Sequence, residues 1–249
     1  MGEEISPKKE AKGKKHYLVF DSDLYRHYTE NRINIQRKGN DIMSVPDKSI
    51  DPRLLAAAKD EFLKKGFEKA SLSEICKTAG VTTGALYKRY NGKEDLFSAL
   101  VSDMVNEMTE YLSGLEKVDL TGLTDRELYD LFTLTPEINR EWLRFLYDRR
   151  DVFTLLIRCA SGTRYENFRQ DWTQKMNALD VRQYQEARRR GLAAKELTAE
   201  ELHVLTYAIW ALYYEPFFLD FTWEQMQRHA ETIHLFVDWH KALEMKKPD

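Results

Sequence analysis

Apolar side chains recur every three or four positions through nearly all of the chain after residue 51, whereas strand-like alternation is scarce. This spacing places one apolar stripe along a helix, which can pack against other helices. The pattern therefore predicts a nearly all-α protein. Residues 1–15 are polar, rich in lysine and without periodicity, so we expect them to be flexible.

Short polar signals predict where several helices begin. Asp51 followed by Pro52 is typical of a helix start, and Gly66 is expected to end that helix. Thr135 before Pro136 is a second start of this type. Capping boxes predict four more starts, at Ser71 with Glu74, Thr124 with Glu127, Thr198 with Glu201, and Thr222 with Gln225.

The same patterns predict where the longer helices run. We expect helices over residues 93–112, 138–159, 199–215 and 223–245. The run Arg188–Gly191 is expected to end a further helix, because cations favour the negative end of the helix dipole and glycine commonly follows that end. A nucleic-acid contact is the competing interpretation of these arginines.

Residues 71–90 carry the most informative pattern. They predict two short helices joined by a tight turn in which Gly80 takes the left-handed conformation. In the second helix Leu86 and Tyr90 face inward, so that Tyr87 and Lys88, with Gly84, face outward. A unit of this kind inserts its second helix into the DNA major groove.

The charge is unevenly distributed along the chain. Residues 1–50 hold 10 Lys and Arg against 8 Asp and Glu, residues 51–97 hold 9 against 7, and residues 98–249 hold 19 against 26. A mildly basic front suits phosphate contact, while the acidic remainder would be repelled by the same duplex. Charge therefore agrees with DNA binding but does not establish it.

The remaining composition favours a cytoplasmic protein without a metal site or a catalytic centre. Cys76 and Cys159 are too few for a disulfide framework and are expected to be reduced, and no apolar run is long enough for a membrane span. The six histidines are not spaced as metal ligands on one helix face or as part of a catalytic set. We expect no cofactor and no enzymatic activity.

The segment from Pro52 to Leu100 resembles the tetracycline-repressor (TetR) family of bacterial transcription regulators. The likeness rests on Lys65-Gly66-Phe67, Ser71-Leu72-Ser73-Glu74-Ile75, Ala79-Gly80-Val81, Gly84-Ala85-Leu86-Tyr87 and Lys93-Glu94-Asp95-Leu96. It implies a three-helix DNA-binding domain over residues 51–97, preceded by an N-terminal extension over 1–50. It also implies a helical effector-binding and dimerisation domain over residues 98–249.

The resemblance further implies individual roles in DNA binding. Thr82 and Thr83 would reach base edges or phosphates, and Gly84 would let the backbone approach the groove closely. Tyr87 would donate its hydroxyl to a phosphate, and Lys88 would contact a phosphate or a guanine edge. The remaining positions of the expected interface are Ser71 and Lys93, at phosphates, and Ala85, which departs from the family pattern and could pack on a thymine methyl.

Within residues 142–223 aromatic side chains are dense, and most of them are expected in the core. A few with polar tips could line a pocket for a planar or apolar small molecule, with arginines nearby for an anionic group. The candidate effector contacts are Arg144, Tyr147, Arg158, Tyr165, Trp210 and Tyr214.

The last two predicted helices are apolar around most of their circumference, through Val204, Tyr207, Ala208, Trp210, Ala211 and Tyr213 among others. Either a large core surrounds them or one face meets a second copy, and the second reading predicts a homodimer on a palindromic operator, most simply as a repressor. A DNA-bound adaptor, whose back domain binds a protein instead of a small molecule, is the alternative.

The leader, residues 1–42, allows three interpretations. Residues before 43 could form a solvated tail or a basic arm in the minor groove. Alternatively, Met43 is the natural start and the residues before it are translated regulatory sequence.

Overall fold

The computed structural model describes residues 50–249, and the expectations for the leader and for a start at Met43 lie outside this range. The regular elements of the described part are helices, which confirms the all-α prediction. In chain order they are α2 (Ile50–Lys69), α3 (Leu72–Ala79), α4 (Thr83–Tyr87), α5 (Lys93–Glu116), η1 (Leu120–Gly122), α6 (Asp125–Asp130), α7 (Pro136–Tyr147), α8 (Arg150–Arg158), α9 (Phe168–Arg189), α10 (Ala199–Phe218), α11 (Trp223–Phe236) and α12 (Trp239–Ala242).

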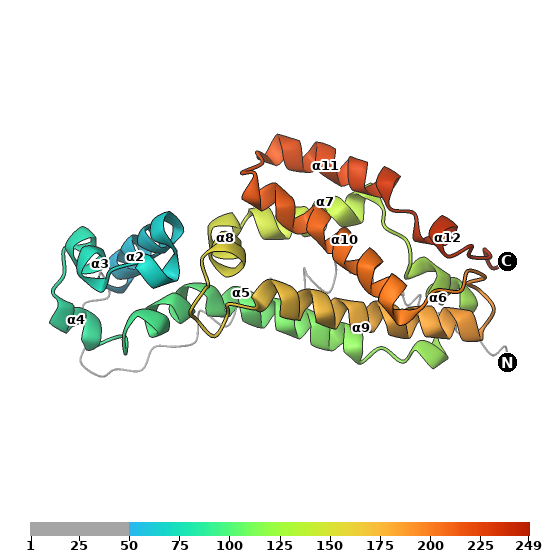
Figure 1. Cartoon of the computed structure of the whole chain (residues 1–249), viewed down its shortest axis with the longest axis horizontal. Coiled ribbons are helices and arrows are strands. Elements are labelled where there is room, and N and C mark those ends of the chain that lie inside the picture. Colours follow the sequence, from blue (N-terminus) through green and yellow to red (C-terminus); the bar gives the residue numbers. More distant parts are fainter. Residues whose placement is uncertain (1–49) are drawn as a thin grey trace, which may run out of the picture.

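Helices α2, α3 and α4 form a small head at one end of the molecule, and the first turns of α5 complete it (Figure 1). Phe62, Ile75 and Leu86 are fully buried there, one from each of the first three helices. Leu96 and Phe97 of α5 are equally buried. The predicted inward face of α4 is thus confirmed at Leu86, which holds that short helix on the head.

The body of the molecule extends away from the head along α5. Figure 1 shows α9 beside α5, with α10 crossing toward the pair formed by α7 and α11. The core between these layers is aromatic, because the indoles of Trp142, Trp172 and Trp210 lie within 6.1 Å of one another, centroid to centroid. The three bury a large apolar area per side chain.

A second, smaller core closes the end of the body farthest from the head. Leu128 of α6, Ala187 of α9 and Leu243, just after α12, are fully buried in it. An isolated bridge between Ala193 and Met245 joins the chain there. No helix of residues 50–249 is long and apolar enough to cross a membrane.

Most of the predicted helix signals are confirmed. The boxes beginning at Thr124, Thr198 and Thr222 each make both reciprocal hydrogen bonds. Thr135 caps α7 ahead of its first-turn proline. Gly80 has φ 65°, so its backbone takes the left-handed form that the tight turn requires.

The capping box predicted at Ser71 is wrong. Ser71 is the N-cap of α3, but its side chain caps no backbone N–H. Its own backbone N–H donates to Glu61 Oε1 of α2 at 3.2 Å, which takes the place that Glu74 was expected to fill. A tertiary contact from the preceding helix has therefore replaced the local one.

Three predicted helix boundaries also need correction. Helix α2 already includes Ile50, so Asp51 lies inside it. The helix expected over 138–159 is two helices, α7 and α8, because the chain turns at Asp148 and Arg149. That turn lets Arg149 reach the buried carboxylate of Glu107 on α5, with 3.1 Å between Nη2 and Oε2.

The helix expected over 223–245 ends at Phe236 instead. Val237 is extended, and Asp238 then caps the short α12 by accepting from the backbone N–H of Lys241 at 3.0 Å. The break turns Trp239 and Leu243 toward the second core, where Leu243 is fully buried. Apolar burial thus outweighs the continuation of one helix.

Candidate functional site

Helix α4 presents a polar surface at the tip of the head. Thr82 and Thr83 are exposed at its start, and the Thr82 hydroxyl oxygen accepts from the backbone N–H of Ala85 at 3.2 Å. This bond fixes the first turn and leaves the Thr82 hydroxyl hydrogen available to donate. Lys88 is exposed, and the Tyr87 ring keeps 59% of its surface in solvent although its neighbour Leu86 is fully buried.

At Gly84 and Ala85 little or no side chain projects from this surface. Ala85 is half-buried, and a Cβ added to Gly84 would find only the Thr82 hydroxyl oxygen, 4.0 Å away. The backbone conformation of Gly84 is helical, so nothing within the described protein requires a glycine there. A surface without a side chain allows another molecule to approach the α4 backbone closely.

Lys93 and Ser71, the two residues of the expected interface that lie farther from α4, are less accessible than the exposed residues on α4. Lys93 donates from Nζ to the carbonyl oxygens of Glu68 at 2.9 Å and Ala70 at 3.2 Å, and lies 4.6 Å from the Phe67 ring centroid. Its ammonium therefore fastens the end of α2 to α5 and has one N–H left for an external acceptor. Ser71 is half-buried, and its hydroxyl is not used to cap α3.

Residues 54–100 match the sequence model of the tetR family of bacterial regulatory proteins, and this stretch spans the head just described. The head of this chain is therefore of the TetR type. The resemblance of the motifs from Pro52 to Leu100 is thereby confirmed.

Curated relatives share only part of their length with this chain. A helix-turn-helix transcriptional regulator of Bacillus subtilis, YdgC, is 40% identical over 75 residues, which are 28% of this chain and 38% of the relative. The transcriptional repressor AcnR of Corynebacterium efficiens is 31% identical over 99 residues, 38% of this chain and 53% of the relative. The chain thus spans about half or less of each relative's length.

Among solved structures, a metabolic regulator of Clostridium perfringens superposes with a TM-score of 0.50 at 16% identity. The superposition covers 75% of this chain and 98% of that one. At this identity the likeness supports the fold alone. The shared helical fold includes the body as well as the head.

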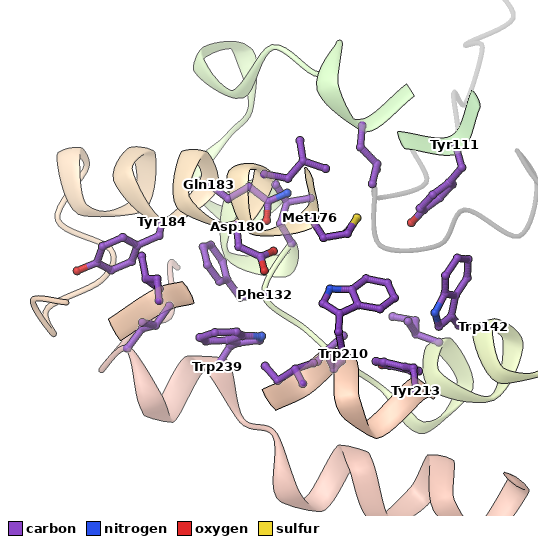
Figure 2. Close-up of a pocket in the computed structure, with 18 residues that line it drawn as sticks. Tyr111, Phe132, Trp142, Met176, Asp180, Gln183, Tyr184, Trp210, Tyr213 and Trp239 are labelled. Atoms are coloured by element: carbon purple, nitrogen blue, oxygen red, sulfur yellow. The ribbon is translucent and has the colours of Figure 1, made fainter. Parts of the chain in front are cut away.

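The body contains a cavity of about 130 Å³ between α5, α7, α9, α10 and the chain around α12. Its wall is largely aromatic and aliphatic, and Figure 2 shows Trp210, Trp239 and Phe132 around the space. Among the lining residues of 50–249, the only ionisable carboxyl belongs to Asp180 of α9. An apolar cavity with few polar groups is typical of a small-molecule site.

The hydroxyl groups at two points of the wall are bound to neighbours. Tyr213 donates to Asn139 Oδ1 at 2.6 Å, and burial raises its pKa. Tyr184 donates to the carbonyl of Lys195 at 2.9 Å and accepts from the backbone N–H of Leu197 at 2.7 Å. These bonds fix the rings as parts of a preformed wall.

Asp180 differs from its apolar surroundings. Its Oδ2 accepts a 2.8 Å hydrogen bond from Thr206 Oγ1, and burial raises the pKa of the carboxyl to about 7. Sequence reasoning did not select this residue. The spacing of Met176, Leu179, Gln183 and Tyr184 on one face of α9, with Asp180 among them, is the signal that could have found it.

Of the six candidate effector contacts, Trp210 alone lines this cavity. Tyr147 and Arg158 line a different hollow of about 360 Å³ between α2, α8 and the turn after α10. Arg144 pairs with Asp148, with 2.8 Å between Nε and Oδ1, and its guanidinium lies over the ring of Trp223.

The last two candidates, Tyr165 and Tyr214, contact side chains of other helices. Tyr165 lies 6.2 Å from Phe97, centroid to centroid, where the body meets the head. The hydroxyls of Tyr214 and Thr173 share a 3.2 Å hydrogen bond within the core. Burial raises the pKa of Tyr214, so its hydroxyl stays protonated there.

The arginine run and the histidines act inside the described structure. Arg190 binds the carbonyl oxygens of Leu120 and Leu123, each at 2.7 Å, and Arg188 binds that of Ala193 at 2.9 Å. This placement agrees with the end-of-helix interpretation, extended to the following loop. Ring nitrogens of His229, His234 and His240 each face a backbone carbonyl oxygen at 2.6–2.9 Å.

Proposed function

We propose that this chain is a ligand-responsive, DNA-binding transcriptional regulator that acts as a homodimer on a palindromic operator, most simply as a repressor. The observation that carries the proposal is the surface of α4. It exposes two threonines, a tyrosine and a lysine around a bare glycine, on a helix anchored by the buried Leu86. Within residues 50–249 the Tyr87 ring keeps 59% of its surface exposed, which leaves it available to an external partner.

The chemistry of this surface suits a DNA groove. Threonine hydroxyls and the Lys88 ammonium can donate to base edges and phosphates, and the Tyr87 hydroxyl can donate to a phosphate. Relatives that match this chain are described as helix-turn-helix regulators, and AcnR as a repressor. These descriptions support regulation of transcription as the role of the chain.

A dimer follows from the size of the reading surface. One short helix buries too little area to select an operator, so two heads in successive major grooves are needed, about 34–36 Å apart. We assign the dimer contact to α10 and α11. Exposed apolar side chains support this assignment, at Val204 (64%), Leu235 (82%) and Phe236 (77%).

Response to a ligand is supported by the cavity. It lies in the body, in the part that we assign to effector binding and dimerisation (residues 98–249), whereas residues 51–97 form the DNA-binding part. The head meets the body where Lys59 of α2 pairs with Asp151 of α8 at 2.7 Å and the Phe67 backbone N–H donates to the carbonyl of Cys159 at 2.9 Å. A ligand that binds two arrangements of these contacts differently would shift DNA affinity.

Selection of bound duplexes from a random pool, followed by titration of variants, tests the proposal. Lys88→Ala and Tyr87→Phe should weaken binding, and Lys247→Ala, at the exposed C-terminal end far from α4, is the matched control. Loss of a phosphate contact should weaken all sequences alike and lower the salt slope by about 1, whereas loss of a base contact should relax one position.

The same titrations contain the outcomes that contradict the proposal. If both head variants bind duplexes as the unmodified chain does, α4 is not the reading helix. If the chain is a monomer that ignores duplexes at low salt, the proposal fails as a whole.

A further inference from the structure

The cavity holds a single acidic group in an otherwise uncharged wall. None of the lining residues in the described part of the chain is Lys, Arg or His, and Asp180 is the only Asp or Glu. Within residues 50–249 its one hydrogen bond comes from Thr206, and no cation pairs with it. A carboxyl in such a place costs folding free energy, because its charged form is poorly solvated.

The position of the carboxyl agrees with a role toward a bound molecule. Figure 2 shows the Asp180 side chain directed from α9 into the space bounded by Phe132, Trp210 and Trp239. Thr206 donates to Oδ2, and within residues 50–249 no hydrogen bond to Oδ1 is found. Gln183, one turn farther along α9, brings an amide to the same wall.

The aromatic rings of the wall also favour a cation over an anion. The faces of indole and phenol rings attract cations, and a desolvated cage of such rings around a carboxylate binds ammonium groups. Trp142, Trp210, Trp239 and Tyr111 all line the cavity. An anion would meet both the Asp180 charge and the negative ring faces without any basic partner.

We propose that the ligand of this cavity is a small monocation, an ammonium or amidinium group on an aromatic or short alkyl body, with Asp180 as its counter-ion and the tryptophan rings as its walls. The volume of about 130 Å³ limits the body to about one ring, since a cavity of about 150 Å³ accommodates benzene. This inference rests on the proposed function only in treating the cavity as the effector site.

Three probes of similar size distinguish a preference for a cationic, a neutral or an anionic group. Benzylammonium, benzyl alcohol and benzoate differ at a single group, and the quenching of tryptophan fluorescence by each can be checked by calorimetry at about pH 8, where Asp180 can ionise. We expect benzylammonium to bind about 10-fold or more tightly than benzyl alcohol, and benzoate more weakly than either.

Substitution then assigns the preference to one carboxyl. Asp180→Asn keeps the shape and an acceptor for Thr206, and it should lower benzylammonium affinity about 10-fold or more while changing benzyl alcohol affinity less than about 2-fold. Asp171→Asn, an exposed acid of the same helix, is the control and should change neither.

Each other result overturns the inference. If benzylammonium does not bind at millimolar concentration, the site does not take this cation. If benzyl alcohol or benzoate binds as tightly as benzylammonium, the site is not selective for cations. If Asp180→Asn binds benzylammonium unchanged, Asp180 is not the counter-ion. The order of the three probes on the unmodified chain decides the question even where the variant folds poorly. Duplex binding measured on the same samples reports separately on the proposed function.

Discussion

Replacing Asp180 by Asn should make the protein more stable at neutral and alkaline pH. In the folded chain the carboxyl is surrounded by apolar groups and receives one hydrogen bond from Thr206. Burial raises its pKa from an ordinary 3.8 to about 7. An amide of the same shape keeps the acceptor for Thr206 and removes the charge that the cavity solvates poorly.

The direction of the pH effect follows from proton linkage. Below about pH 4 the carboxyl is protonated in both the folded and the unfolded chain, so it causes no difference. Between about pH 4 and pH 7 the unfolded chain releases the proton and the folded chain keeps it, so stability falls as pH rises. Above about pH 7 both forms are ionised and the loss is complete.

The magnitude follows from the size of the shift. Each pKa unit corresponds to about 1.4 kcal/mol, so a rise from 3.8 to about 7 lowers the free energy of unfolding by about 4 kcal/mol above pH 7. About 2–3 kcal/mol of this loss falls between pH 5 and pH 8, because part of it is already present at pH 5. Entry of water into the cavity would reduce both values.

Urea unfolding followed by tryptophan fluorescence measures the effect. Protomer concentration is held constant, because dimerisation would make stability depend on it. The difference between Asp180→Asn and the unmodified chain should grow from pH 5 to pH 8, while Asp171→Asn should follow the unmodified chain. A difference that stays constant within about 0.5 kcal/mol over this range would show that Asp180 is solvated like a surface carboxylate.

Three further predictions concern other parts of the molecule. Gly84→Ala should raise the free energy of unfolding by about 0.5–1 kcal/mol, because alanine favours the helix and fits without a clash. The same variant should bind duplex more weakly in a fluorescence anisotropy titration, and an unchanged DNA affinity would contradict a close approach to the α4 backbone. Arg190→Met should lower the free energy of unfolding by about 2–3 kcal/mol, since it removes a donor from the carbonyl oxygens of Leu120, Thr121 and Leu123 near α6. The exposed Arg189→Met should give no resolvable change, and equal urea midpoints for the two variants would refute this. Phe236→Glu should weaken the proposed dimer to a monomer in sedimentation equilibrium, and a dimer of unchanged affinity would place the interface elsewhere.

The sequence predicted the head well because its signals are local. The tight turn at Gly80, the inward position of Leu86 and the exposure of Tyr87 follow from helix periodicity and from backbone preferences of single residues. The capping boxes at Thr124, Thr198 and Thr222 are local in the same sense, since each needs only side chains three residues apart. These features form in nearly any helical context.

Local signals failed where a distant residue offered a better partner. Glu61 of α2 binds the Ser71 N–H in place of Glu74, and Arg149 turns the chain to reach the buried Glu107 of α5. The break after Phe236 is of the same kind, because it turns Leu243 into a core made by α6 and α9. Helix periodicity contains no information about such partners.

The sequence by itself determined an all-helical chain, the short helix at residues 83–87 with its outward polar face, and the likeness of the head to the TetR family through motifs that lie within fifty residues of one another. Tertiary structure alone decided which aromatic residues enclose the cavity and that Asp180 is the acid within it. The physical reason is that a cavity forms from helices far apart in the chain, and its wall depends on how they cross. A pattern along one helix shows which residues face inward, but not what they face.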